Sequence, residues 1–263
     1  MITSKTNSQM KYLSLLLKKK SARDEDRVFV TEGRKMFFEV LKQAPELLVK
    51  AYWSEKGLAA LSEEETCLLA SCPYEEVRDD VFASVAETVT PQGVLAIVKM
   101  PYRTIDDMVA SGKGLLLLET IQDPGNLGTM LRTAEAAGIG GIILSSDSVD
   151  AYGPKVVRAT MGAIFRVPFL YVESFTDTLQ FLKIRGVKLY AAHLEGSVAY
   201  DEPEYRGQYG IMIGNEGNGL SEEATALSDV RVRIPMEGQA ESLNAAVAAA
   251  ILMYEAKRQQ GIS

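Results

Sequence analysis

Cysteine, histidine and tryptophan are scarce in this sequence: its 263 residues include two cysteines, one histidine and one tryptophan. The cysteines, Cys67 and Cys72, indicate neither a disulfide framework nor a four-ligand zinc site, and we predict no metal site. No apolar run reaches the ~18 residues of a membrane-spanning helix. The lysine-rich N-terminus lacks the apolar core of a signal peptide, so we expect a soluble cytoplasmic protein.

Negative charge dominates the sequence as a whole, but its first 35 residues are basic. The net charge of −7 argues against a protein that binds nucleic acid over its whole surface. Residues 1–35, however, contain nine lysines and arginines against four acidic residues. This local surplus fits an N-terminal arm that contacts phosphates, and it fits a solvated tail helix equally well.

Helical and strand patterns alternate over the first hundred residues. We expect helices at 8–20, 32–42 and 79–86, strands at 28–30, 47–53 and 93–99, and possible strands at 66–70 and 75–77. This alternation is sufficient for a small α/β domain over residues 1–100. Residues 100–113, which include Pro101 and Gly112, form the predicted linker.

The second half begins with four consecutive leucines at 115–118, a pattern typical of a parallel strand buried on both faces. Further strands are expected at 141–144, 167–171, 187–192, 210–213 and 230–234. Helical segments separate most of them, which predicts a doubly wound parallel sheet within residues 114–263. Such sheets bind ligands beyond the carboxyl ends of their strands, so we expect a site in the loops that follow them.

The loop after the first of these strands contains Asp-Pro-Gly-Asn, a tight-turn sequence that ends at Asn126. We expect Asn126 to cap a helix at 127–137. Arg132 lies in this helix, one turn before Glu135. The two could form a surface ion pair, or Arg132 could bind an anionic substrate near the helix start.

A glycine-rich loop at 214–220 follows the strand 210–213. Its order, G-x-x-G-x-G, is not the dinucleotide-binding fingerprint, and no Gly-Lys-Ser/Thr follows as in a P-loop. Its glycines would let the backbone approach a ligand closely. The alternative is an ordinary turn before a helix that Ser221 caps.

The third loop joins the strand 230–234 to a long C-terminal helix. Pro235 ends the strand, and Ser242 is the expected N-cap of a helix that starts at Leu243. Residues 245–254 include no charged side chain, so this helix should be buried in a core or against another chain.

Taken together, the three loops resemble the three motifs of the SpoU (TrmH-type, SPOUT superfamily) RNA ribose 2′-O-methyltransferases. The first motif is matched by Asn126 and 131–136, the second by 214–220, and the third by 234–236 and 241–244. Their order and spacing also agree, and the resemblance covers residues 115–258. The region 29–99 is similar to the family's N-terminal substrate-binding domain, which has a ribosomal-protein L30e-like fold.

The resemblance implies a parallel sheet with a deep trefoil knot, S-adenosylmethionine as methyl donor, and a homodimer formed through the knot and the helix 243–258. It implies catalytic or RNA-binding roles for Asn126, Arg132, Glu216, Ser242 and Asn244. It implies donor-binding roles, largely through the backbone, for Gly214, Asn215, Gly217, Gly219, Ile234, Pro235, Met236 and Leu243.

Methyl transfer to a ribose 2′-hydroxyl requires the nucleophile within about 3–3.5 Å of the methyl carbon and the loss of a proton. The family assigns proton removal to the motif-one arginine, here Arg132, although a guanidinium resists deprotonation. Alternatively, Arg132 binds the adjacent phosphate and stabilises the alkoxide, while the proton leaves through water or Glu216. We assign no role to the single histidine, His193.

Two departures from the family pattern, at 159–163 and 243–246, preserve small packing residues and leave substrate choice open. We therefore predict a methyltransferase that acts on ribosomal RNA, because a separate N-terminal domain is more typical of the rRNA enzymes. A tRNA substrate is one alternative. A non-catalytic RNA-binding or ribosome assembly factor is the other, but it would not need Asn126, Arg132 and Glu216 together.

Overall fold

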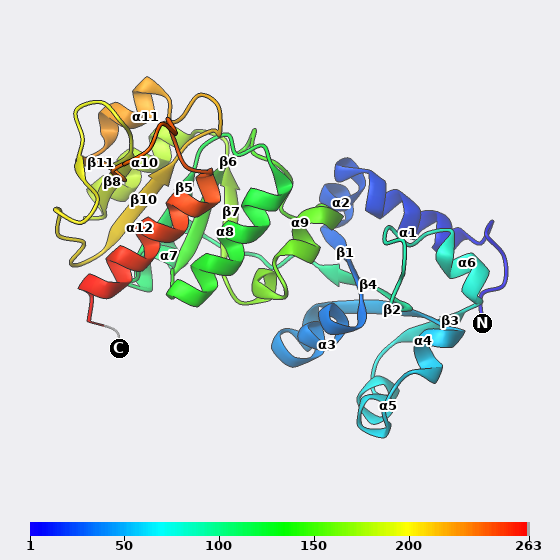
Figure 1. Cartoon of the computed structure of the whole chain (residues 1–263). Helices are drawn as coiled ribbons and strands as arrows, with labels where there is room; N and C mark the ends of the chain where they lie inside the picture. Colours follow the sequence, from blue (N-terminus) through cyan, green and yellow to red (C-terminus); the bar gives the residue numbers. More distant parts are fainter. Residues whose placement is uncertain (262–263) are drawn as a thin grey trace. The chain divides into compact units, whose positions relative to one another are not determined.

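The computed structural model describes residues 1–261 and divides into two compact units. The first unit comprises Met1–Tyr102 together with Asp150–Phe165, and the second comprises Arg103–Val149 and the described residues from Arg166 onward (Figure 1). Over the described part of the chain, no helix combines the length and apolarity needed to cross a bilayer.

The first unit is built on a mixed four-stranded sheet in the order β1-β4-β2-β3. Its strands are β1 (Val28–Glu32), β4 (Val94–Lys99), β2 (Leu48–Ser54) and β3 (Tyr74–Val77). β4 is antiparallel to both of its neighbours, whereas β2 and β3 are parallel. The sequence located β1, β2 and β4, which are runs rich in apolar and β-branched residues, and indicated β3 as a possible strand.

Helices of the first unit cover its sheet. They are α1 (Ser8–Lys18), α2 (Lys20–Asp26), α3 (Arg34–Gln43), α4 (Glu55–Ala59), α5 (Glu63–Ala70) and α6 (Asp79–Ala83), with a short 3-10 helix η1 (Pro45–Leu47). The predicted helix 8–20 breaks at Lys19, whose backbone is extended. The predicted strand 66–70 is wrong: Ser62 and Glu65 form a capping box that starts α5 there instead.

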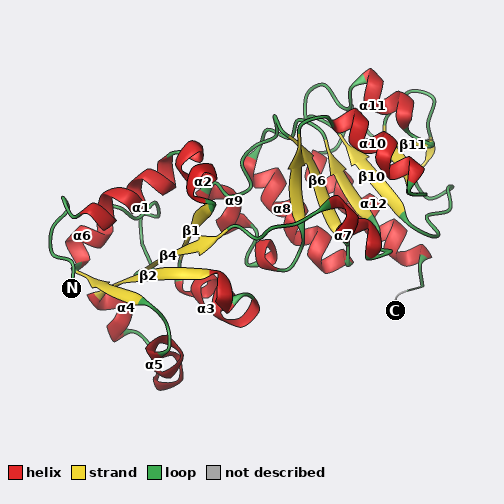
Figure 2. Cartoon of the chain, turned by 180° about the vertical axis from the view of Figure 1, so that it is seen from behind, coloured by secondary structure: helices red, strands yellow, loops and turns green. Residues whose placement is uncertain are grey.

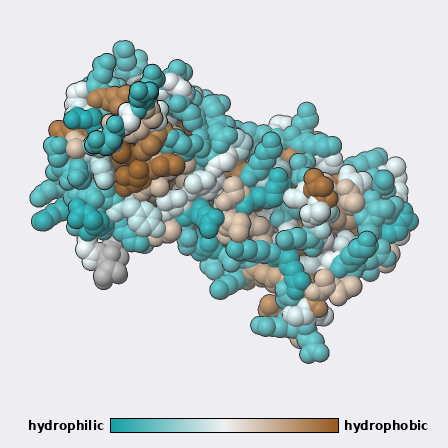
Figure 3. All heavy atoms as spheres, viewed as in Figure 1, coloured by the Kyte–Doolittle hydropathy of each residue, from teal (hydrophilic) through white to brown (hydrophobic). Residues whose placement is uncertain are grey.

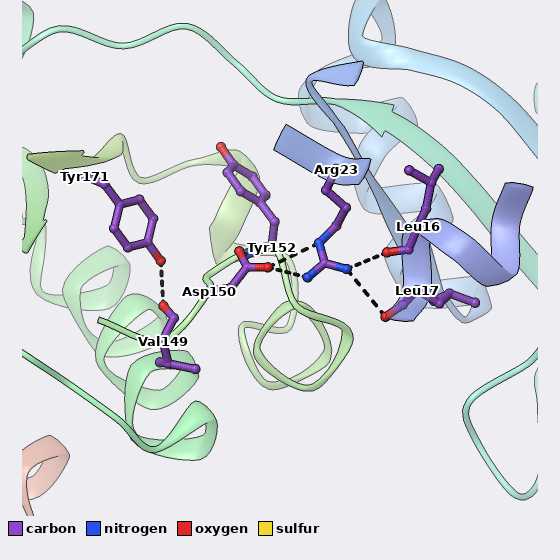
Figure 4. A network of polar contacts seen from close by, with 7 residues as sticks. All are labelled: Leu16, Leu17, Arg23, Val149, Asp150, Tyr152 and Tyr171. Atoms are coloured by element: carbon purple, nitrogen blue, oxygen red, sulfur yellow. Dashed lines mark hydrogen bonds and ion pairs between the residues drawn. The ribbon is translucent and has the colours of Figure 1, made fainter. Parts of the chain in front are cut away.

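Residues 150–165 pack with the first unit although they lie between the two sequence segments of the second. They contain α9 (Pro154–Ala159) and the 3-10 helix η2 (Ala163–Phe165). The guanidinium of Arg23, only 5% exposed, donates to the carboxylate of Asp150 and to two carbonyls of α1 (Figure 4). The ring of Tyr152 lies 4.8 Å from that of Phe29 in β1. A buried cation must be paired, so this segment completes the core of the first unit.

The second unit contains a seven-stranded sheet in the order β7-β6-β5-β10-β8-β11-β9. The strands are β7 (Phe169–Val172), β6 (Gly141–Ser145), β5 (Leu115–Leu118), β10 (Tyr209–Ile213), β8 (Lys188–Ala192), β11 (Val230–Arg233) and β9 (Val198–Ala199). Every neighbouring pair is parallel, which confirms the predicted sheet. The two-residue edge strand β9 was not foreseen, because so short a segment carries no periodicity.

Helices cover both faces of this sheet (Figure 2). They are α7 (Ile105–Ala110), α8 (Pro124–Ala137), α10 (Phe175–Ile184), α11 (Glu222–Leu227) and α12 (Ala245–Gln259). α7, α10 and α11 bury their apolar side chains on one face, and α8 packs against α12 on the other. The predicted linker 100–113 is therefore partly wrong, because α7 lies within it and buries Met108 in this core.

Helix α12, in which residues 245–254 carry no charge, is buried on only one side. Ala249, Leu252 and Met253 are buried, whereas Val247 and Tyr254 are each 47% exposed. Apolar atoms gather on the surface around the N-terminal half of α12 (Figure 3). The core of the second unit therefore buries one side of α12, as predicted, and the other side leaves an apolar strip with Val247 and Tyr254 on the surface.

Candidate active site

Helix α8 begins three residues earlier than the sequence analysis predicted. Asp123 is its N-cap, and the carboxylate accepts a hydrogen bond of 2.7 Å from the backbone N–H of Asn126. The prediction that Asn126 caps the helix is wrong, because Asp is an equally good cap and Pro124 suits the first helical position. Asn126 thus lies in the first turn, where its side chain can bind other groups.

Asn126, Glu216 and Asn244 form a hydrogen-bonded cluster at the carboxyl edge of the sheet. The amide of Asn126 donates to Glu216 Oε1 at 2.9 Å, and the amide of Asn244 donates to Asn126 Oδ1 at 2.8 Å. These residues are 90 and 118 positions apart in the sequence, and they come from the three loops that the motifs identified. We call them the amide–carboxylate cluster.

Glu216 is the acceptor of this cluster. Its carboxylate also accepts hydrogen bonds from the backbone N–H groups of Gln122 and Asp123, each at 3.2 Å. Partial burial raises the pKa of Glu216, but the hydrogen bonds from Asn126 and the backbone outweigh this effect and hold the pKa below its usual value. Glu216 is consequently ionised at neutral pH.

Asn244 caps helix α12. Its Oδ1 accepts from the backbone N–H groups of Ala246 at 2.9 Å and Val247 at 3.3 Å, which leaves the amide to donate to Asn126. The predicted cap, Ser242, is wrong by two residues, because α12 starts at Ala245 rather than at Leu243. The cap fixes the rotamer of Asn244 and so supports the amide–carboxylate cluster.

The glycine-rich loop is a closed turn between β10 and α11. Asn215 and Gly219 exchange two backbone hydrogen bonds of 2.9 Å, and Gly219 has a φ of +70°. A Cβ on Gly214 would lie only 2.1 Å from the carbonyl carbon of Gly219, so no other residue fits there. The carboxylate of Glu119 then binds the N–H and hydroxyl of Ser221 at 2.8 and 2.7 Å, which fixes the end of the turn.

A cavity of about 560 Å³ opens beside this turn, beyond the carboxyl ends of β8, β10 and β11. Its volume suits a small molecule of nucleoside size. The predicted donor-binding residues that line it are Gly214, Asn215, Gly217, Gly219, Ile234, Met236 and Leu243. Pro235 is the exception: it is exposed and does not contribute to the lining. The lining of the cavity therefore combines glycine backbone and apolar side chains with polar groups, among them His193 and Glu216.

Two of the predicted catalytic residues lie outside the amide–carboxylate cluster. Ser242 is exposed and lines the cavity next to Glu216. Arg132 is exposed on α8, and among residues 1–261 no hydrogen bond or ion pair holds it. Glu135 pairs instead with Arg166 at 3.0 Å, so the proposed Arg132–Glu135 surface pair is absent from the described structure. Arg132 is available for an anionic ligand.

Some contributors to the site were missed by the sequence analysis. Gln122 and Asp123 bind Glu216 through backbone N–H groups, which no side-chain pattern reveals. His193, to which no role was assigned, lines the cavity, and its Nδ1 lies 3.1 and 3.2 Å from the carbonyl oxygen and the nitrogen of Glu195. The position of His193 directly after a predicted strand could have indicated that it lies near the site.

Comparison with protein families gives the class of protein that this fold and site define. The model of the SpoU rRNA Methylase family matches residues 113–254, and that of the MRM3-like substrate binding domain matches residues 7–96. The chain belongs to the SpoU rRNA methylase family. It is an RNA ribose 2′-O-methyltransferase that takes its methyl group from S-adenosylmethionine.

Individual relatives are similar to this chain over nearly its whole length. The chain is 36% identical to the 23S rRNA (guanosine(2553)-2′-O)-methyltransferase RlmP of Bacillus subtilis, over 96% of this chain and 97% of the relative. The AdoMet-bound rRNA methyltransferase from Sinorhizobium meliloti is 31% identical and superposes with a TM-score of 0.86, covering 100% and 98% of the two chains. The methyltransferase AviRb from Streptomyces viridochromogenes, in complex with AdoMet, is 28% identical with a TM-score of 0.86, over 97% and 98%.

Proposed function

We propose that this enzyme methylates the 2′-hydroxyl of a nucleotide in ribosomal RNA. The observation that carries the proposal is the amide–carboxylate cluster at the rim of a cavity of nucleoside size. The similarity to RlmP, a 23S rRNA methyltransferase, over almost the full length of both chains supports ribosomal RNA over tRNA. A non-catalytic assembly factor would not require this hydrogen-bonded arrangement of Asn126, Glu216 and Asn244.

The donor site is proposed to be the cavity beside the glycine-rich turn. Gly214, Asn215, Gly217 and Gly219 would hold the donor from one side. Ile234, Met236 and Leu243 would hold it from the other, with Pro235 fixing the loop between them. The close approach of backbone at Gly214 fits a ligand held by main-chain groups. The donor supplies an electrophilic methyl group on a positively charged sulfur.

For catalysis, we assign orientation and charge rather than proton removal to Glu216. A carboxylate that accepts three hydrogen bonds from other residues and has a lowered pKa is a weak base, so water is the better acceptor for the 2′-hydroxyl proton. Its negative charge favours a cationic ligand beside it. The unpaired guanidinium of Arg132 is assigned to the adjacent phosphate and the developing alkoxide, with Ser242 and Asn244 orienting the ribose.

The proposal also covers the part of the chain that binds RNA and the surface that forms a homodimer. The substrate-binding domain over residues 1–100, with the exposed lysines 18–20 on its surface, would hold the RNA, and residues 114–263 would catalyse transfer. The exposed apolar strip of α12, with Val247 and Tyr254, supports a homodimer interface. A trefoil knot in the catalytic domain remains a prediction of the resemblance, and a cytoplasmic location remains a prediction from the N-terminal sequence.

A methyl-transfer assay tests the function directly. Purified protein is incubated with tritiated S-adenosylmethionine and either deproteinised ribosomal RNA or total tRNA. Both RNAs come from a strain in which the gene for this protein has been deleted. We expect label in ribosomal RNA that nuclease digestion recovers as a 2′-O-methylnucleoside. Label in tRNA alone would transfer the proposal to tRNA. Donor binding by calorimetry without transfer to either RNA would favour an assembly factor.

A further inference from the structure

Thr120, the second residue after β5, has a backbone conformation that its side chain disfavours. Its φ is +54°, in the left-handed region that β-branched residues rarely adopt. No glycine relieves the strain at this position. Such a conformation persists only where the surroundings enforce it, and it concentrates at functional sites. The contacts around Thr120 identify both what enforces it and what it serves.

Ser145, the last residue of β6, and Asp147, two residues further on, hold Thr120 in place. Ser145 Oγ accepts from the N–H of Thr120 at 2.7 Å and donates to Asp147 at 2.5 Å. The hydroxyl of Thr120 donates to the other oxygen of Asp147 at 2.8 Å. Hydrogen bonds from Ser145 and Thr120 lower the pKa of Asp147, against a smaller opposing effect of burial, which keeps it a charged acceptor at neutral pH.

Thr120 influences both Asn215 and Glu216 of the glycine-rich loop. The carbonyl of Thr120 accepts from the side-chain amide of Asn215 at 2.9 Å. That amide's oxygen in turn accepts from Gly217 and Asn218, so it determines the shape of the turn. The residues directly after Ile121 are those whose N–H groups bind Glu216. A change of φ at Thr120 would redirect all of these donors and acceptors together.

We propose that Thr120 and Asp147, with Ser145, are positioning residues for methyl transfer: they hold the loop after β5 in the conformation that places Glu216 and Asn215. The proposal rests on the function proposed above. None of the three residues lines the donor cavity, so they act only through the loop. An error of about 1 Å in a reacting group can reduce the rate about 100-fold, so the strain can be worth its cost.

Three substitutions of Thr120 distinguish the effect of its hydroxyl group on kcat from the effect of its backbone strain. Thr120→Val keeps the β-branch but loses the bond to Asp147, and kcat should fall by about 100-fold with little change in the KM for ribosomal RNA. Thr120→Ser retains the hydroxyl and should stay near the wild-type rate. Thr120→Gly removes the strain and the hydroxyl together, so its kcat should lie between the two.

Asp147→Ala should reduce kcat at least as much as Thr120→Val, because it removes the hydrogen bonds from both Thr120 and Ser145. The double variant should be no worse than Asp147→Ala alone, because the contact between Thr120 and Asp147 is already lost there. The matched control is Thr104→Val, which removes a 2.6 Å Thr–Asp hydrogen bond at the start of α7, away from the site. The control should lose stability without losing kcat. Equal kcat in Thr120→Val and Thr104→Val would overturn the proposal.

A second readout does not depend on RNA. Amide hydrogen exchange, followed by mass spectrometry on the full chain, should accelerate over residues 214–220 in Asp147→Ala but not in Thr104→Val. The Asp147 carboxylate makes no hydrogen bond to that segment, and its partners Thr120 and Ser145 connect it to the loop after β5, where the carbonyl of Thr120 binds Asn215. If the wild type transfers no methyl group, the proposed function fails, and the exchange rates still decide the positioning. Unchanged exchange over 214–220 would refute it.

Discussion

The amide–carboxylate cluster and the donor cavity adjoin each other, yet they are built in different ways. The cluster consists of side-chain hydrogen bonds among Asn126, Glu216 and Asn244. The wall beside Gly214 consists of closely packed backbone, with no room for a Cβ. The first should therefore be sensitive to charge and hydrogen-bonding groups, and the second to volume. Substitutions that change only one of these properties can test the difference.

The largest effect is expected from Arg132→Ala. Removal of this unpaired cation takes away the proposed stabilisation of the alkoxide, and kcat should fall by about 1000-fold. Donor binding, measured by calorimetry with S-adenosylmethionine, should remain close to wild type, because Arg132 does not line the cavity. Full turnover in the variant would contradict its assigned role.

Gly214→Ala tests the cavity by volume alone. The added methyl group would collide with the backbone of Gly219 and Leu220, so the turn must shift, and donor affinity should fall by about 100-fold. Gly238→Ala is the control, because a Cβ there meets no atom within 4 Å. Comparable losses of affinity in both variants would show that the effect of Gly214→Ala does not come from close packing.

Glu216→Gln tests the cluster by charge at constant shape. A hydrogen bond to a charged group is worth about 1.5–3 kcal/mol, so kcat should fall by about tenfold or more. Donor affinity should change less than in Gly214→Ala. If the order of the two affinities is reversed, the division between charge-sensitive and volume-sensitive parts is wrong.

The same variant gives a pH prediction. Because the pKa of Glu216 is lower in the folded protein, its charge stabilises the fold above the usual glutamate pKa, and this stabilisation disappears as pH falls through the folded-state value. The free energy of unfolding of the wild type should therefore exceed that of Glu216→Gln at neutral pH and approach it in acid. Denaturant titrations at several pH values measure the gap, and a constant gap would contradict the prediction.

The smallest effect on chemistry should come from the exposed lysines 18–20, far along the chain from both parts of the site. Replacing all three with glutamine should weaken RNA binding and reduce the slope of log affinity against log salt by about 2, given about 0.7 per contact with a single strand. kcat at saturating RNA should be preserved. An unchanged slope would mean that these lysines belong to a solvated helix only.

Much of the second unit could be predicted from the sequence, because parallel strands buried on both faces are continuous apolar runs. The leucines at 115–118 are the clearest case. The three loops were found because glycine, asparagine and proline stand where strands end. Helix starts were less certain: Asp123 and Asn126, or Ser242 and Asn244, are equally good caps by residue type, and only packing selects one.

Other features depend on distant contacts. Arg23 and Asp150 are 127 residues apart, so no local pattern could assign residues 150–165 to the first unit. The left-handed backbone of Thr120 is likewise hidden, because the usual signals for that conformation are glycine and asparagine. Segment 105–110 was interpreted as part of a linker because Pro101 and Gly112 flank it, and its six-residue helix is too short to show a clear apolar period.

The assignment of residues 150–165 to the first unit also has a consequence for protein synthesis. When the ribosome has made only residues 1–102, Arg23 still lacks its partner Asp150, and the ring of Phe29 still lacks its contact with Tyr152. The N-terminal unit cannot complete its core until residue 165 has emerged, when β5, α8 and β6 are already outside the exit tunnel. The two units should therefore mature together during translation rather than one after the other.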